Sequence, residues 1–131
     1  MFIDASALTA LLADEHDARE LLARLARSGT RLTSPLAVWE ATIAVARVLD
    51  LTIAETADAL ERYLALMEIK VVPVPPEAGR IALDAFDRYG KGRHPARLNF
   101  GDCFAYACAR HFAQPLMFKG ADFPQTDIEA A

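Results

Sequence analysis

The hydrophobic positions along the chain alternate between short apolar runs and longer stretches with helical spacing. Leu21, Leu22 and Leu25 recur at intervals that place side chains on one face of a helix, and Ser28-Gly29 ends that stretch. The same spacing predicts a helix that begins near residue 7 and further helices over 16–27, 35–50, 53–67, 76–89 and 100–112. Short apolar runs predict strands over 2–4, 31–33, 69–72 and 115–118.

Capping residues mark the starts of several of these helices. Thr52 followed by Glu55 is a capping box, in which the side chains satisfy free backbone N–H groups reciprocally. Ser34 ahead of Pro35 places a cap before a proline at the first helical position. We also expect Ser6 to cap the first helix, which would then begin immediately after it.

Strands that alternate with helices require crossover connections, which build a mainly parallel sheet covered on both faces. The sequence therefore predicts an α/β fold, a three-layer sandwich with a short sheet between helices. The 131 residues suit one domain over 1–131, and no repeat or linker interrupts them. Ligands of such sheets bind beyond the carboxyl ends of the strands, so we look for a site there.

Composition narrows the class of protein. Hydrophobic residues make up 53% and charged residues 24%, which suits a packed core and argues against disorder. Apolar runs fall far short of the roughly 20 residues that span a bilayer, and the first residues lack a basic signal segment. We therefore expect a cytoplasmic protein without a membrane span. Cys103 and Cys108 lie five residues apart on one predicted helix and suit a core better than a disulfide or a zinc site.

Asp4 and Glu40 are the first two candidate acids. Asp4 ends the first predicted strand, although a carboxylate there also suits a helix cap. Glu40 has no base at helical spacing; its helical neighbours are Leu36, Ala37, Ile43 and Ala44. A carboxylate beside core positions is costly unless a cation or hydrogen bonds compensate it, whereas a glutamate on the outer face is simply solvated.

Asp102 and Asp122 are the other two candidates. Asp102 is the third residue after the predicted cap Asn99, where its charge also favours the positive end of the helix dipole. Asp122 follows Gly120 in a loop, where turn formation is the alternative role. Each signal is weak alone.

The net charge of −4 is unfavourable for binding nucleic acid unless acids hold cations, which reverse the local charge. A basic loop before Asp102 offers contacts to phosphate groups, with Lys119 as an addition; its members are Lys91, Arg93, His94 and Arg97. Ordinary loop solubility is the alternative. We assign His94 to the surface rather than to catalysis, and Trp39 to core or interface rather than to base stacking.

Three stretches carry a family resemblance that spans essentially the whole chain. The opening 1–8 reads MFIDASAL, the stretch 89–107 reads YGKGRHPARLNFGDCFAYA, and the stretch 118–123 reads FKGADF, with Thr126-Asp127 beyond it. Together they resemble PIN-domain toxins of the VapC type. The resemblance implies a PIN-like sandwich with Asp4, Glu40, Asp102 and Asp122 as a catalytic and metal-binding quartet.

Other residues take supporting roles in the resemblance. Ser6 supports the quartet, and Ala5 replaces a hydroxyl residue often found there. Asp127 is the alternative to Asp122 as the last carboxylate, or helps to orient it. Carboxylates without His or Cys suit Mg²⁺, with Mn²⁺ as the other candidate, and such ions promote phosphodiester hydrolysis.

The resemblance further implies an endoribonuclease with an RNA substrate and a cognate antitoxin of the VapB type. It also implies a homodimer, and a heterotetramer or larger assembly with the antitoxin. The alternative is a catalytically silent PIN-like module that binds RNA or protein. A phosphoryl-transfer hydrolase with Asp4 as nucleophile is disfavoured, because Ser6 stands where a second aspartate is usual.

Overall fold

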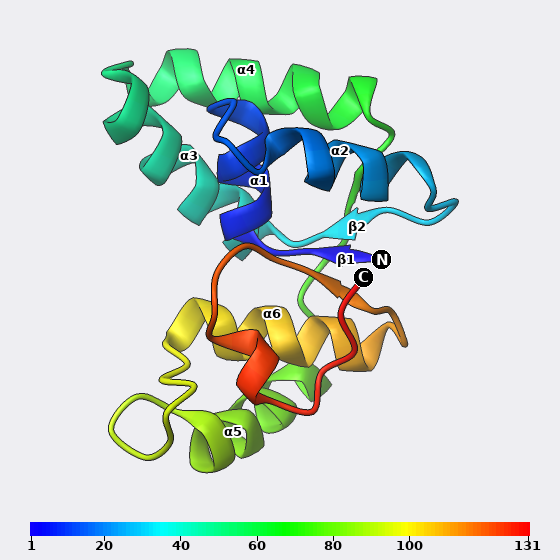
Figure 1. The fold of residues 1–131 in the computed structure, drawn as a ribbon, viewed down its shortest axis with the longest axis vertical. Coiled ribbons are helices and arrows are strands. Elements are labelled where there is room, and N and C mark those ends of the chain that lie inside the picture. The colour runs from blue at the N-terminus through cyan, green and yellow to red at the C-terminus, as the bar shows by residue number, and fades with distance from the viewer.

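In the computed structural model, which describes residues 1–131, four two-residue strands form one sheet (Figure 1). They are β1 (Phe2–Ile3), β2 (Leu32–Thr33), β3 (Lys70–Val71) and β4 (Leu116–Met117). The strand order is β3-β2-β1-β4 and all three pairings are parallel, so β1 lies inside the sheet. The predicted parallel sheet is confirmed.

Helices cover both faces of this sheet. On one face lie α1 (Ala5–Leu12), α2 (Ala18–Ala26), α3 (Pro35–Leu49) and α4 (Ile53–Leu66). On the other lie α5 (Pro76–Tyr89) and α6 (Phe100–His111), and a short 3-10 helix, η1 (Phe123–Gln125), follows β4. The α/β three-layer sandwich is confirmed, and Figure 1 shows the helices above and below the strands.

The short strands divide the hydrophobic core into two clusters. Ile3 and Met117 belong to the cluster with α1 to α4, whereas Phe2 and Leu116 belong to the cluster with α5 and α6. All four side chains are fully buried. Because successive side chains of a strand point to opposite faces, two residues suffice to join a strand to both layers.

The start of the first helix differs from the prediction. Helix α1 begins at Ala5, and its cap is Asp4 rather than Ser6. Asp4 has extended backbone angles, with φ −77° and ψ 159°, and its carboxylate accepts a hydrogen bond from the Ser6 N–H. The carboxylate therefore takes the capping role ahead of the serine, which lies inside the first turn. The capping box of Thr52 and Glu55 is present as predicted.

The leucines of α3, α4 and the turn between them lie partly in the core and partly on the surface. Leu60 and Leu64 are buried in the core, whereas Leu49 and Leu51 are exposed. Trp39 is 66% exposed, which excludes the core position that we considered for it.

Both cysteines are buried free thiols, as expected for core residues. None of the helices combines the length and the apolar character that crossing a membrane requires.

Candidate active site

Asp4 lies at the carboxyl end of β1, in the middle of the sheet. Its side chain is held by Ser6, whose backbone N–H donates to Asp4 Oδ2 at 2.9 Å and whose hydroxyl donates to the same oxygen. The residue is only 4% exposed, and burial raises its pKa although hydrogen bonds from Ser6 and Ala5 oppose that effect. Asp4 is thus both a helix cap and a buried carboxylate with a fixed orientation.

Ser6 also connects Asp4 to the segment after β4. The backbone N–H of Lys119 donates to Ser6 Oγ at 3.0 Å. The hydroxyl therefore accepts one hydrogen bond and donates another, which sets the direction of its proton toward Asp4.

Glu40 approaches Asp4 from α3. Its carboxylate is half-buried and lies against Gly101 of α6. Burial raises the pKa of Glu40 most, and the charges of Asp4 and Asp102 raise it further. No base opposes this effect, so Glu40 faces other acids without a positive partner.

Asp102 reaches the same region from the first turn of α6. It forms a capping box with Asn99, because Asp102 Oδ2 accepts from the Asn99 N–H and Asn99 Oδ1 accepts from the Asp102 N–H, each at 2.9 Å. Burial raises the pKa of Asp102 to about 6, the hydrogen bond from Asn99 lowers it, and the charges of Asp4 and Asp122 raise it. Asp102 therefore helps to cap its helix, and its carboxylate also faces the other acids.

These three acids meet at one pocket of about 300 Å³. It is lined by Asp4, Ala5, Ser6, Thr9, Glu15, Glu40, Ala44, Asn99, Asp102 and Lys119. Sequence reasoning missed Glu15, because it stands in the polar run DEHD over 14–17, which looks like an ordinary solvated loop. Asn99 was recognised only as a cap.

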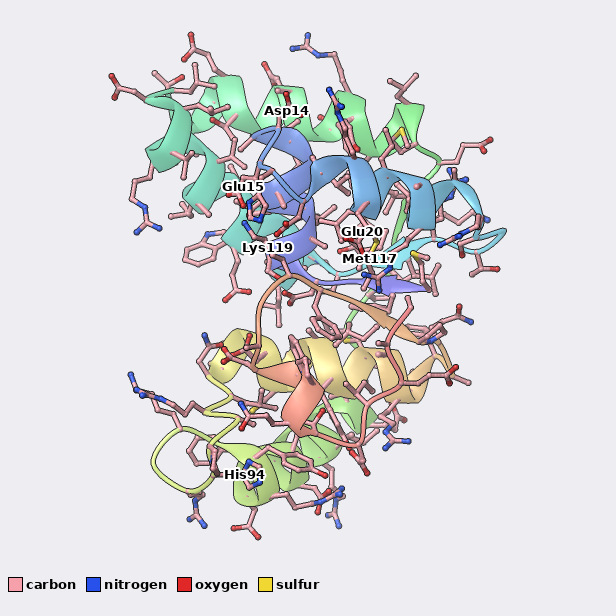
Figure 2. All side chains as sticks on the ribbon, viewed as in Figure 1. Asp14, Glu15, Glu20, His94, Met117 and Lys119 are labelled. Atoms are coloured by element: carbon pink, nitrogen blue, oxygen red, sulfur yellow. The ribbon has the colours of Figure 1, made fainter.

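Lys119 and Glu15 form an ion pair at this pocket, and Lys119 Nζ also lies 3.6 Å from Asp17 Oδ2. Figure 2 shows Lys119 beside Glu15, far from His94 of the basic loop. The structure therefore separates Lys119 from the loop bases with which we had grouped it for RNA binding. Its ammonium group neutralises acids at the rim of the pocket.

The two candidates for the fourth acid lie in different surroundings. Asp122 is exposed at the start of η1, within electrostatic reach of Asp102, but it does not line the pocket. Asp127 accepts from the Tyr106 hydroxyl at 2.7 Å and pairs with Arg88 and Arg110 at 3.0 and 2.9 Å. These partners hold the pKa of Asp127 well below its usual range despite some burial. The geometry favours Asp122 over Asp127 as a neighbour of the site.

The basic loop over 90–98 forms a second, separate depression. Backbone hydrogen bonds close the loop, with Lys91 N–H donating to the Leu98 carbonyl at 2.9 Å. A cavity of about 500 Å³ is lined by Lys91, Gly92, Arg93, His94, Pro95 and Arg97. Arg93 pairs with Asp87 at 2.8 Å, whereas neither Lys91 nor Arg97 has an acidic partner.

The donor chemistry of the acid pocket suits a hard divalent cation. Its acidic side chains offer carboxylate oxygens, and neither His nor Cys lines it. The carboxylates do not converge tightly, because no three His, Cys, Asp or Glu side chains in the structure are arranged as a group that could hold a metal ion. The residues fit an open, partly hydrated site better than a closed cage.

The fold and the acid pocket point to one class of protein. The family model of the PIN domain matches residues 1–129. The chain therefore belongs to the PIN-domain family, as the sequence resemblance implied.

Several relatives of this chain within that family are VapC ribonucleases. Ribonuclease VapC30 of Mycobacterium tuberculosis is 40% identical over 129 residues, which cover 98% of this chain and 95% of the relative. Ribonuclease VapC of Mycolicibacterium smegmatis is 40% identical over 131 residues, covering 99% and 98%. A VapC ribonuclease of Rhizobium meliloti is 37% identical over 139 residues, covering 97% and 98%.

A solved structure has the same fold. The crystal structure of Mycobacterium tuberculosis VapC20, a Sarcin–Ricin loop cleaving toxin, matches with a TM-score of 0.76. The match covers 99% of this chain and 97% of that chain at 18% sequence identity, which supports the fold alone.

Proposed function

We propose that this protein is an endoribonuclease, the toxin of a toxin–antitoxin pair, with a Mg²⁺ or Mn²⁺ site formed by Asp4, Glu40, Asp102 and Asp122. The observation that carries the proposal is the pocket beyond β1, where three carboxylates with raised pKa values face one another and none of them pairs with a base. Full-length similarity to VapC ribonucleases supports the same activity.

Different residues of the chain would bind the ion, orient its carboxylates and contact the RNA. Mg²⁺ or Mn²⁺ bound there would polarise a phosphodiester and make a water molecule a better nucleophile. Asp4 is oriented by Ser6, and Asp102 is oriented by Asn99, so two of the four carboxylates are held in place before an ion binds. Lys91 and Arg97 have no acidic partner and suit contacts to the RNA backbone.

The test is RNA cleavage by the purified, antitoxin-free chain with Mg²⁺, Mn²⁺ or excess chelator. Asp4→Asn and Asp102→Asn should abolish the metal-dependent cleavage, whereas the matched control Asp58→Asn, at an exposed position of α4, should leave it intact. RNA binding without cleavage under every metal condition would instead favour a silent PIN-like binding module. Equal cleavage by all three variants would refute the site.

The partners in this proposal are a VapB-type antitoxin and a second copy of the chain. An exposed apolar groove between α5 and α6 offers a contact surface; it is lined by Gly79, Ala82, Leu83, Phe86, Phe100, Cys103 and Phe104. Light scattering of the chain, alone and with its antitoxin, should give a homodimer and a heterotetramer or larger assembly. A monomer under both conditions would contradict this assembly.

A further inference from the structure

Gly101 stands in the first turn of α6, immediately before Asp102, and it is buried. Its backbone does not need glycine, because only Gly92 and Gly120 among the glycines have positive φ. A glycine inside a helix is also a poorer helix former than alanine. The reason for a glycine here therefore lies in the space beside it.

That space is filled by the carboxylate of Glu40. A Cβ added at Gly101 would lie no farther than 2.5 Å from Glu40 Cδ and from both carboxylate oxygens, closer than real Cβ atoms approach other atoms. The other internal helical glycine behaves differently, since a Cβ at Gly79 of α5 meets nothing within 4 Å. Gly101 is the one glycine at which an acid of the pocket occupies the position that a Cβ would take.

The space beside Gly101 lets Glu40 lie close to Asp102, although the two residues come from different helices. The Glu40 carboxylate lies against the first turn of α6, one residue from Asp102, and both residues line the acid pocket. Free N–H groups and the helix dipole at this end of a helix favour a negative charge.

We infer that Gly101 is a positioning residue, whose missing side chain admits the Glu40 carboxylate to the acid pocket beside Asp102. This inference rests on the proposed function, because it concerns the geometry of the proposed metal site. The atoms that would collide are the mobile end of a long side chain rather than backbone. Alanine at 101 should therefore leave the fold intact and turn Glu40 away from the pocket.

The experiment compares Gly101→Ala with Gly29→Ala as a control, because Gly29 is an exposed loop residue where an added Cβ meets nothing within 4 Å. Calorimetric titration of the metal-free proteins with Mn²⁺, without RNA, measures the affinity of the site independently of cleavage. We expect Gly101→Ala to weaken Mn²⁺ binding roughly 10–100-fold, as for other changes that misalign a ligand. The melting temperature of Gly101→Ala without metal should not fall, and Gly29→Ala should bind Mn²⁺ like the wild type.

A second background makes the test specific. Glu40→Asp shortens the side chain by one methylene and withdraws the carboxylate from residue 101. In that background Gly101→Ala should cause no further loss of Mn²⁺ affinity or cleavage rate, so the two changes should be strongly non-additive.

Three results would overturn the inference. One is wild-type Mn²⁺ affinity in Gly101→Ala, and another is an equal loss in the Glu40→Asp background. The third is a lowered melting temperature that Glu40→Asp does not restore, since it would place the collision in the backbone. A wild-type chain that neither binds Mn²⁺ nor cleaves RNA would instead refute the proposed function, and the inference with it.

Discussion

Replacing Asp102 with asparagine should stabilise the metal-free protein while it removes activity. The substitution takes one negative charge from a pocket that Asp4 and Glu40 share. Asparagine keeps a side-chain oxygen that can accept from the Asn99 N–H, as Asp102 Oδ2 does now. The capping box therefore persists, and the charge is the main difference between the two proteins.

The size of the effect follows from the pKa of Asp102, which burial raises from 3.8 to about 6. At about 1.4 kcal/mol per pH unit, ionising this carboxylate in the fold costs about 3 kcal/mol at pH 8. Because the carboxylate is partly exposed, solvent screening reduces the expected gain for Asp102→Asn to about 2 kcal/mol.

The gain should depend on pH in a defined direction. Below pH 3.8, Asp102 is protonated in the folded and unfolded states, and the substitution changes little. Between pH 3.8 and about 6 the unfolded chain loses this proton while the folded chain still holds it, so the wild type loses stability relative to the variant as the pH rises, and the loss levels off above about pH 6. The advantage should fall below about 0.5 kcal/mol at pH 4.

Urea unfolding in the presence of chelator, followed by circular dichroism at pH 4 and pH 8, measures these differences. Asp58→Asn, at an exposed position, should match the wild type at both pH values. Added Mg²⁺ should stabilise the wild type more than Asp102→Asn, since the ion compensates the clustered charge. Equal stability of wild type and Asp102→Asn at pH 8, or an advantage that persists at pH 4, would refute the reasoning.

Three further predictions concern residues around the pocket. Asp127→Asn should lower the free energy of unfolding, measured by urea titration, by roughly 1–2 kcal/mol and leave cleavage intact. Because the folded pKa of Asp127 is lowered, this loss should shrink progressively as the pH falls below 3.8, and a variant that keeps its stability but loses cleavage would show that Asp127 belongs to the site. Ser6→Ala should slow cleavage about 10-fold, because Asp4 loses a hydrogen bond that orients it, and an unchanged rate would contradict that role. Replacing Lys91 and Arg97 with glutamine in Asp4→Asn protein should reduce the salt dependence of RNA binding, measured by fluorescence anisotropy, by a slope of about 1.4, and an unchanged slope would place the RNA elsewhere.

Features that depend on nearby residues were predictable from the sequence. Helix α5 spans Pro76–Tyr89, as predicted, because proline starts and helical apolar spacing are local signals. The capping box of Thr52 and Glu55 joins residues three positions apart, and the predicted cap Asn99 is present, with a capping box to Asp102 that the structure adds. The alternation of strands and helices was enough to predict a parallel sheet, since crossover connections follow from chain order.

The acids of the pocket were predictable from the sequence only in part. The family resemblance named Asp4, Glu40 and Asp102 from motifs, whereas local reasoning left each of them with a capping or surface role. The structure shows that the capping roles of Asp4 and Asp102 coexist with their place in the pocket. A carboxylate has two oxygens and several acceptor directions, so a local hydrogen bond does not exclude a place in a shared pocket.

Only the tertiary structure decided which distant side chains meet. Lys119 pairs with Glu15 across 104 positions, and Asp127 is held by Arg88 and Arg110 rather than by the acid pocket. The space that Gly101 leaves for Glu40 likewise depends on how α3 packs against α6. The Gly101–Glu40 contact arises where helices from opposite layers meet at the end of the sheet, and the ion pairs join loops and helices that lie far apart in the chain. No spacing along the chain records the distances between these residues.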